Sequence, residues 1–96
     1  MDVLVVVDMQ NDFVSGALGT QEAADIVPYV VGRVVDGLNR GETVFFTRDT
    51  HEADYLSTQE GKKLPVPHCI RGTEGWEIIP QLQEYAAHPI DKPTFG

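Results

Sequence analysis

Apolar and polar residues follow one another in blocks that predict two strands joined by a helix. Residues 3–7 are all branched and apolar, a run without alternation that is typical of a strand buried on both faces of a parallel sheet. Residues 43–47 are β-branched or aromatic and predict a second strand. Between them, apolar residues recur at helical spacing from Val27 to Leu38, which predicts an amphipathic helix with Pro28 in its first turn. Together these elements predict a right-handed βαβ unit.

The rest of the chain carries weaker patterns. Residues 11–20 have the composition of a loop. The connection over residues 50–73 is long for a compact domain, and its histidines favour a binding loop. After it we expect a helical turn at 73–77, a short amphipathic helix at 78–85 and a weak third strand at 87–91.

These elements indicate an α/β fold built on a mainly parallel, Rossmann-like sheet. Three parallel strands and two helices cannot cover both faces of such a sheet, as parallel sheets require. We therefore expect residues 1–96 to be the N-terminal part of one larger domain, through truncation, cleavage or a split gene. A second polypeptide or a further C-terminal segment would then complete the sheet. The alternative is a small domain completed by self-association, and we expect the protein to be a homo-oligomer.

The composition limits the partners of the chain. It has 96 residues and a formal net charge of −8. Because phosphate binding needs a basic surface, this charge argues against nucleic acid or an anionic membrane as a partner. Met1 leads into the first strand without a basic leader, and residues 3–7 are too few to cross a membrane. Cys69 is the single cysteine and cannot form an intramolecular disulfide, so we expect a cytoplasmic protein.

Three strand ends carry charged side chains, namely Asp8, Asp49 and Lys92. The carboxyl ends of parallel strands share one edge of the sheet, and ligands of open α/β sheets bind beyond that edge. A carboxylate there can take the proton of a nucleophile, while a lysine favours the anionic form of the nucleophile. Taken alone, Asp8 would be read as a cap or loop carboxylate and Lys92 as a solvated charge. Their joint placement makes both of them candidate catalytic residues.

An Asp-x-His pattern at Asp49 and His51, followed by His68, is typical of metal ligands. Carboxylate oxygen and imidazole nitrogen together suit one divalent ion of zinc, iron or manganese. Residues two apart on an extended segment can point the same way, so Asp49 and His51 can share an ion. Water, Tyr55 or Asp54 would fill the fourth position. The alternative is a chance pattern that binds no metal.

Two further residues have competing interpretations. Cys69 has the apolar Ile70 beside it and follows no strand-to-helix turn that would expose a thiol, which favours a buried structural cysteine over a nucleophile. Phe13 lies just past Asp8. It either lines a pocket for a flat substrate or makes a core contact that closes the loop over the first helix.

Four segments of the chain resemble the nicotinamidase/isochorismatase-like cysteine hydrolases, and they occur in the order found in that family. The segments are Val-Val-Asp-Met-Gln-Asn-Asp-Phe at 6–13, Phe-Thr-Arg-Asp-Thr-His at 46–51, Pro-His-Cys-Ile-Arg-Gly-Thr at 67–73, and Asp-Lys-Pro-Thr-Phe-Gly at 91–96. The resemblance implies a three-layer α/β/α fold around a larger, mainly parallel sheet. It also implies an Asp-Lys-Cys catalytic triad, to which Asp8 and Lys92 contribute the acid and the lysine. The nucleophilic cysteine of the family lies in the later half of the domain, whereas Cys69 matches a non-catalytic position.

The nicotinamidase-like branch of the family holds a divalent metal with residues that match Asp49, His51 and His68. The chain departs from that branch at two positions. Tyr55 stands where the branch usually has another histidine, and Pro65 stands where it often has a tryptophan.

The resemblance implies hydrolysis of an amide C–N bond in a small molecule. In that reaction a thiolate from the later half attacks the carbonyl, Asp8 acts as base and then as acid, and Lys92 stabilises the thiolate. We expect residues 1–96 alone to be inactive, because they lack this cysteine. One alternative is a receiver-like module that is phosphorylated on Asp49. A stronger alternative is a non-catalytic metal-binding or interaction domain.

Overall fold

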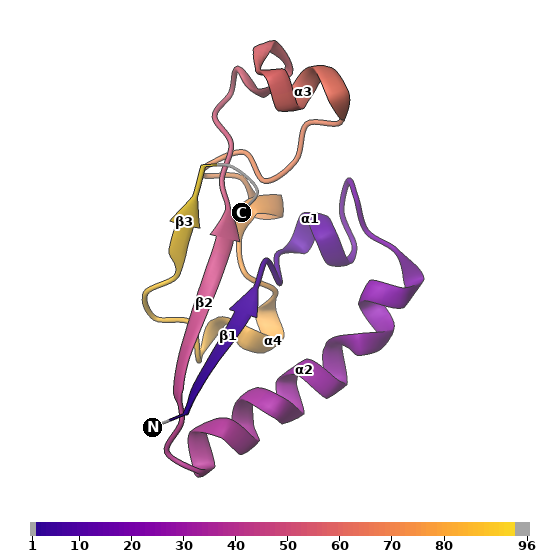
Figure 1. Ribbon diagram of the computed structural model, residues 1–96. Helices are drawn as coiled ribbons and strands as arrows, with labels where there is room; N and C mark the ends of the chain where they lie inside the picture. Colours follow the sequence, from indigo (N-terminus) through magenta and orange to yellow (C-terminus); the bar gives the residue numbers. More distant parts are fainter. Residues whose placement is uncertain (1, 94–96) are drawn as a thin grey trace.

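The computed structural model describes residues 2–93 and shows an α/β arrangement around a short sheet (Figure 1). The elements, in chain order, are β1 Val3–Val7, α1 Asn11–Val14, α2 Gln21–Asn39, β2 Thr43–Asp49, the 3-10 turn η1 Tyr55–Ser57, α3 Gln59–Lys63, the 3-10 turn η2 Glu74–Trp76, α4 Pro80–Gln83 and β3 Ile90–Lys92. None of these helices combines the length and the apolar character that crossing a bilayer needs.

The three strands form one parallel sheet in the order β1-β2-β3. Val5 lies opposite Phe45, and Thr47 lies between Val7 on one side and Ile90 on the other. The predicted parallel pairing is therefore confirmed. As a consequence, all three carboxyl ends lie at the same edge of the sheet, with the loop that contains α3 beyond it (Figure 1).

Helix α2 is longer than the apolar stripe predicts. It begins at Gln21, where the Thr20 hydroxyl caps it by accepting a hydrogen bond from the Ala23 backbone N–H at 3.0 Å. Pro28 consequently lies inside the helix, and its predicted place in the first turn is wrong. The prediction started too late because the first turn carries small and polar side chains that give no periodic apolar signal.

Several short elements also differ from the sequence-based expectation. Residues 11–14 form the helix α1 where a loop was predicted. Helix α4 is shorter than predicted because Ile79 is extended, with ψ of 146°, and Pro80 can only start a helix there. Strand β3 begins at Ile90, three residues later than predicted. The long connection after β2 contains η1 and α3 and is held back to the sheet by a bridge between His51 and Ile70.

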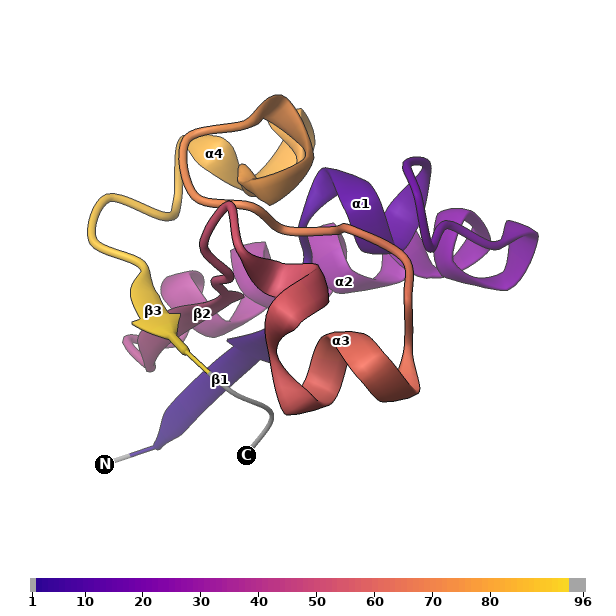
Figure 2. The same ribbon diagram turned by 90° about the horizontal axis from the view of Figure 1, so that it is seen from above.

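The core lies on one face of the sheet. Val6 and Phe46 point to that face and pack with Val34 of α2 and Leu82 of α4 in a single apolar cluster. Figure 2 shows α2 and α4 on the same side of the strands. The described residues thus supply two layers of the three that the resemblance implies.

The opposite face of the sheet is apolar and exposed. Val3, Val5 and Val7 are 55, 51 and 57% exposed, and Phe45 and Ile90 continue the same surface across β2 and β3. We call these five residues the apolar face. The prediction that the first strand is buried on both faces is wrong for the described part of the chain. The reason is that its run of branched residues suits a second covering layer, which residues 2–93 do not provide.

Candidate active site

Asp8 lies at the carboxyl end of β1, where the chain leaves the sheet. Its φ of 56° falls in the left-handed region, which aspartate tolerates better than most residues and which often marks functional sites. The Thr47 hydroxyl of β2 donates to Asp8 Oδ1 at 3.2 Å. This contact, which sequence reasoning missed, fixes the carboxylate against the neighbouring strand.

Lys92 at the end of β3 reaches across β2 to the same carboxylate. Its Nζ lies 3.1 Å from both carboxylate oxygens of Asp8. The side chains of Lys92 and Asp8 are 23 and 15% exposed. Most of the pair is therefore shielded from water, while a part of it remains open to a reacting molecule. The predicted convergence of these two strand ends is therefore present. A carboxylate held beside an ammonium group can exchange a proton with a reacting group while the net charge of the pair stays low.

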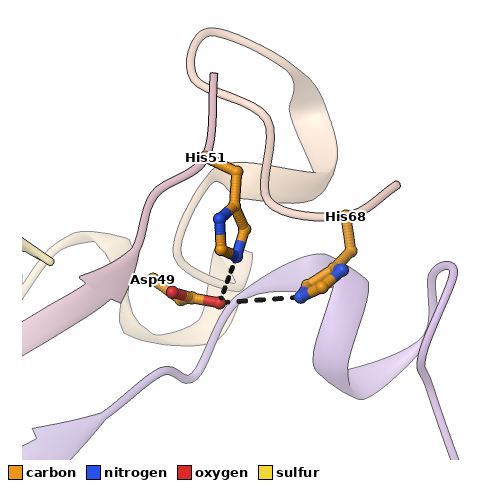
Figure 3. A group of neighbouring side chains, drawn as sticks. All are labelled: Asp49, His51 and His68. Carbon is orange, nitrogen blue, oxygen red and sulfur yellow. Dashed lines mark hydrogen bonds and ion pairs between the residues drawn. The ribbon is translucent and has the colours of Figure 1, made fainter. Parts of the chain in front are cut away.

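Asp49, His51 and His68 form a second cluster beside this pair, shown in Figure 3. Both imidazoles converge on one carboxylate oxygen of Asp49. The distances to that oxygen, Oδ2, are 3.0 Å from His51 Nε2 and 3.6 Å from His68 Nε2. All three residues are buried, and one ligand atom from each lies within 4.8 Å of the others. The pattern read from the sequence thus corresponds to a real convergence of one oxygen and two nitrogens.

The hydrogen bonding of this cluster fits a cation. His68 Nδ1 lies 2.7 Å from the Val66 carbonyl oxygen, which can only accept, so Nδ1 donates this hydrogen bond and Nε2 is the ring nitrogen that faces Asp49. Nε2 of His68 and Oδ1 of Asp49 are both buried without a hydrogen-bond partner among the described residues. Unpaired buried polar atoms are costly, and a divalent ion among these three side chains would satisfy Nε2 of His68.

The residue next to this cluster is Glu60, which sequence reasoning missed. Its Oε2 lies 3.3 Å from His51 Nε2, because helix α3 folds back over the end of the sheet. The proposed role of Tyr55 as a fourth ligand is wrong, since its hydroxyl donates to the Leu64 carbonyl at 2.8 Å. Asp54 is exposed and outside the cluster. A carboxylate on a helix nine residues after His51 leaves no local sequence signal.

Tyr55 instead forms one wall of the cluster. Its ring packs 4.5 Å from the His51 ring and 5.1 Å from the His68 ring, measured between centroids. Burial raises the pKa of the Tyr55 hydroxyl, and the negative charges of Glu60 and Asp49 raise it further. Tyr55 therefore stays neutral, which suits a ring that packs against the His51 and His68 rings.

Cys69 has the character of a structural residue. It is fully buried, and burial raises the pKa of its thiol far above the ordinary range, with further contributions from the charges of Asp49, Asp12 and Asp8. A thiol that stays protonated is a poor nucleophile. The prediction of a buried structural cysteine is confirmed.

Phe13 of α1 packs against the metal-ligand cluster. Its ring meets the His68 ring edge-on, with 5.5 Å between centroids, and the side chain is only half-buried. The role of Phe13 in substrate contact stays a prediction. A cleft of about 620 Å³ lies on the other side of the cluster, bounded by His51, Glu60 and Pro93. A small molecule in this cleft would reach His51, one of the three candidate metal ligands.

Comparisons with known proteins give one consistent picture. The family model of the isochorismatase domain matches residues 2–96. Nicotinamidase from Escherichia coli is 29% identical over 99 aligned residues, which cover 86% of this chain and 46% of that protein. A zinc complex of the pyrazinamidase from Pyrococcus horikoshii is 36% identical with a TM-score of 0.79, covering 98% of this chain and 52% of the other. The nicotinamidase/pyrazinamidase from Bacillus subtilis is 29% identical with a TM-score of 0.80, covering 96 and 56%. The chain thus spans about half the length of these relatives.

Proposed function

Because the chain belongs to the isochorismatase family, we propose that it carries the acid, the lysine and the metal ligands of an enzyme that hydrolyses a small amide. The observation that supports this most directly is the Asp8–Lys92 pair, 3.1 Å apart, beside three buried metal-type ligands at one edge of the sheet. Relatives named nicotinamidase and pyrazinamidase indicate an aromatic carboxamide as the first substrate class to test. Phe13 is the residue we propose to contact its ring.

In this proposal Asp8 moves the protons of the reaction. The attacking group is a cysteine thiol outside residues 1–96, and Asp8 takes its proton. The resulting thiolate forms a C–S bond to the amide carbon, and the carbonyl electron pair moves onto oxygen. When the intermediate collapses, the C–N bond breaks and Asp8 returns the proton to the leaving amine. Water then attacks the thioester and releases the acid and the free thiol.

Lys92 stabilises the negative charge of the thiolate. Its ammonium group lies against Asp8 and would favour the thiolate in a partly dry site. Asp49, His51 and His68 would hold one divalent ion. When bound, such an ion supplies a Lewis acid that orients a substrate heteroatom or a water molecule.

We further propose that activity requires a segment that covers the apolar face. Val5 and Phe45 are half-exposed at its centre, and a parallel sheet is normally covered on both faces. The segment that brings the nucleophile is the best candidate to supply this cover, whether it belongs to the same polypeptide or to a second one.

A complementation experiment tests the proposal. Residues 1–96 are fused to the second half of the Bacillus subtilis relative, and release of ammonia from nicotinamide and pyrazinamide is followed for the fusion and for the chain alone. We expect hydrolysis only by the fusion. Hydrolysis by residues 1–96 alone, or a folded fusion that binds zinc and hydrolyses neither amide, would contradict the proposal.

A non-catalytic metal-binding domain is the second candidate function. It is favoured by the fact that the Asp49, His51 and His68 cluster is complete within the described residues, whereas a nucleophilic thiol is not found among them. Zinc binding by a folded fusion without any amidase activity would favour this candidate.

A further inference from the structure

Gln10 is an uncharged, completely buried residue between β1 and α1, and every polar atom of its amide is used. Its Oε1 accepts a hydrogen bond from the Asp49 backbone N–H at 2.9 Å. Its Nε2 donates to the Asp49 carbonyl at 2.9 Å and to the Trp76 carbonyl at 2.7 Å. A single amide therefore pairs with both the N–H and the C=O of Asp49, as the next strand of a sheet would do. These hydrogen bonds fix the end of β2 and therefore the position from which the Asp49 side chain extends.

Asp12, two residues further along, makes the corresponding contact to the other ligand-bearing segment. Its Oδ2 accepts a hydrogen bond from the Cys69 backbone N–H at 2.8 Å. Cys69 has φ of 49°, in the left-handed region, so the peptide after His68 is held in a conformation that the chain does not prefer. The carboxylate of Asp12 compensates that conformation and sets the direction from which His68 approaches.

Two glycines leave room for the Asp12 carboxylate. A methyl group built at Gly75 would overlap both of its oxygens, and one built at Gly16 would overlap Oδ1. Since Oδ2 is bonded to Cys69 and Oδ1 accepts from the Ala17 N–H at 3.3 Å, the carboxylate cannot swing away without losing these bonds. A side chain at position 75 would therefore displace this carboxylate, so substitution of Gly75 tests the importance of the carboxylate position.

From these contacts we infer that Gln10 and Asp12 are positioning residues for the metal site, Gln10 for Asp49 and Asp12 for His68. The inference rests on the metal site proposed above. One short segment after β1 holds both ligand segments, which come from opposite ends of the long connection. The same segment begins with the Asp8 strand end, so the metal ligands and the Asp8–Lys92 pair are held in one frame. Partners of this kind behind metal ligands typically change metal affinity by about 10- to 100-fold when removed.

The test measures zinc affinity by chelator competition and the visible spectrum of the cobalt form, which reports ligand geometry. The variants are Gln10→Met, which keeps the volume and removes all three hydrogen bonds, Asp12→Ala, Asp12→Asn and Gly75→Ala. Gly32→Ala is the matched control for Gly75→Ala, since a methyl group at Gly32 meets no atom within 4 Å. Thermal unfolding in chelator confirms that each variant is folded.

We expect Gln10→Met, Asp12→Ala and Gly75→Ala to weaken zinc binding by about 10- to 100-fold and to shift the cobalt spectrum. Asp12→Asn keeps an oxygen for the Cys69 N–H and should stay within a few-fold of the parent, and Gly32→Ala should bind zinc as the parent does. This rescue and the spectral shift would not follow from a purely structural role. If Gln10→Met does not fold, the Asp12 and Gly75 variants decide the question.

Two outcomes overturn the inference in different ways. Zinc binding and a cobalt spectrum unchanged in Asp12→Ala and Gly75→Ala would show that the segment stabilises the fold without positioning the ligands. A parent chain that is folded and binds no zinc would overturn the proposed metal site, and the inference with it. The first outcome leaves the proposed function intact and the second does not, so the two failures are distinguishable.

Discussion

The edge of the sheet at the carboxyl ends of its strands differs from the apolar face. At the edge, the described residues pair most of the polar atoms, whereas on the apolar face they leave the side chains uncovered. At the edge, the side chains of Asp8, Gln10, Asp49, His68 and Lys92 have defined neighbours, and most of their polar atoms are paired. We call these five residues the polar edge. On the apolar face, half-exposed valines point into solvent. The described residues thus bring a metal-type set of ligands together, but they cover only one face of the parallel sheet.

The largest effect is expected from substitution of Asp8, the acid of the polar edge. In the active fusion, Asp8→Asn removes the group that takes the thiol proton, and kcat should fall by about 10²- to 10⁴-fold, the usual contribution of general acid–base catalysis. The kcat for the amide substrate is the measurement. Asp25→Asn on the exposed surface of α2 is the matched control and should keep the parent activity. An Asp8→Asn fusion within tenfold of the parent would exclude Asp8 as the base.

The second prediction concerns the metal half of the polar edge. With zinc at about 100 times its dissociation constant, the chain should gain about 2.7 kcal/mol in the free energy of unfolding. His68→Ala removes one of the three ligands and should abolish most of this gain. Denaturant unfolding with zinc and with chelator measures it. His88→Ala is the control, because His88 is exposed and outside the cluster. A zinc-dependent gain that survives His68→Ala would place the ion elsewhere.

The third prediction tests the apolar face against the core on the same strand. Val6 is 6% exposed and Val5 is 51% exposed, so Val6→Ala should lower the free energy of unfolding of the chain by about 2 kcal/mol and Val5→Ala by less than about 1 kcal/mol. In the fusion, where a further layer covers the sheet, the cost of Val5→Ala should approach that of Val6→Ala. Equal costs in the chain alone would mean that self-association covers the face, and sedimentation would then show an oligomer.

The same two regions show what the sequence alone predicts well. The parallel pairing of β1 with β2 and the meeting of Asp8 with Lys92 were predictable, because strand ends of a parallel sheet converge by geometry. The Asp49 and His51 pair was predictable for a local reason, since residues two apart on an extended segment face the same way. Each of these predictions needed only local periodicity and topology.

The sequence failed where position depends on tertiary contacts. The start of α2 was missed because its cap at Thr20 precedes any apolar periodicity. Glu60 approaches His51 only because α3 folds back, and Gln10 reaches Asp49 only because two strand ends lie side by side. Burial was misjudged on β1 because a run of valines records which surfaces are apolar, and it does not say whether the described residues cover them.

The smallest expected effect provides a reference far from both regions, at the amino end of β2. Arg33 donates to Glu42 at 2.8 Å, and this hydrogen bond, with the positive charges of Arg33 and Arg40, holds the pKa of Glu42 below its ordinary value of 4.5. A lowered pKa means that the pair stabilises the chain above pH 4.5 and that this stability is lost as the pH falls through the folded-state pKa. Glu42→Gln should therefore be slightly less stable than the parent at pH 7 and should become equal to it once the pH falls below the folded-state pKa of Glu42, with a gap that shrinks in high salt. Unfolding curves across this pH range measure the gap. Because the Arg33–Glu42 pair touches neither the polar edge nor the apolar face, zinc should leave the stability difference between parent and variant unchanged. A difference that depends on zinc would mean that the two ends of the sheet are coupled. The polar edge could not then be treated as an independent unit.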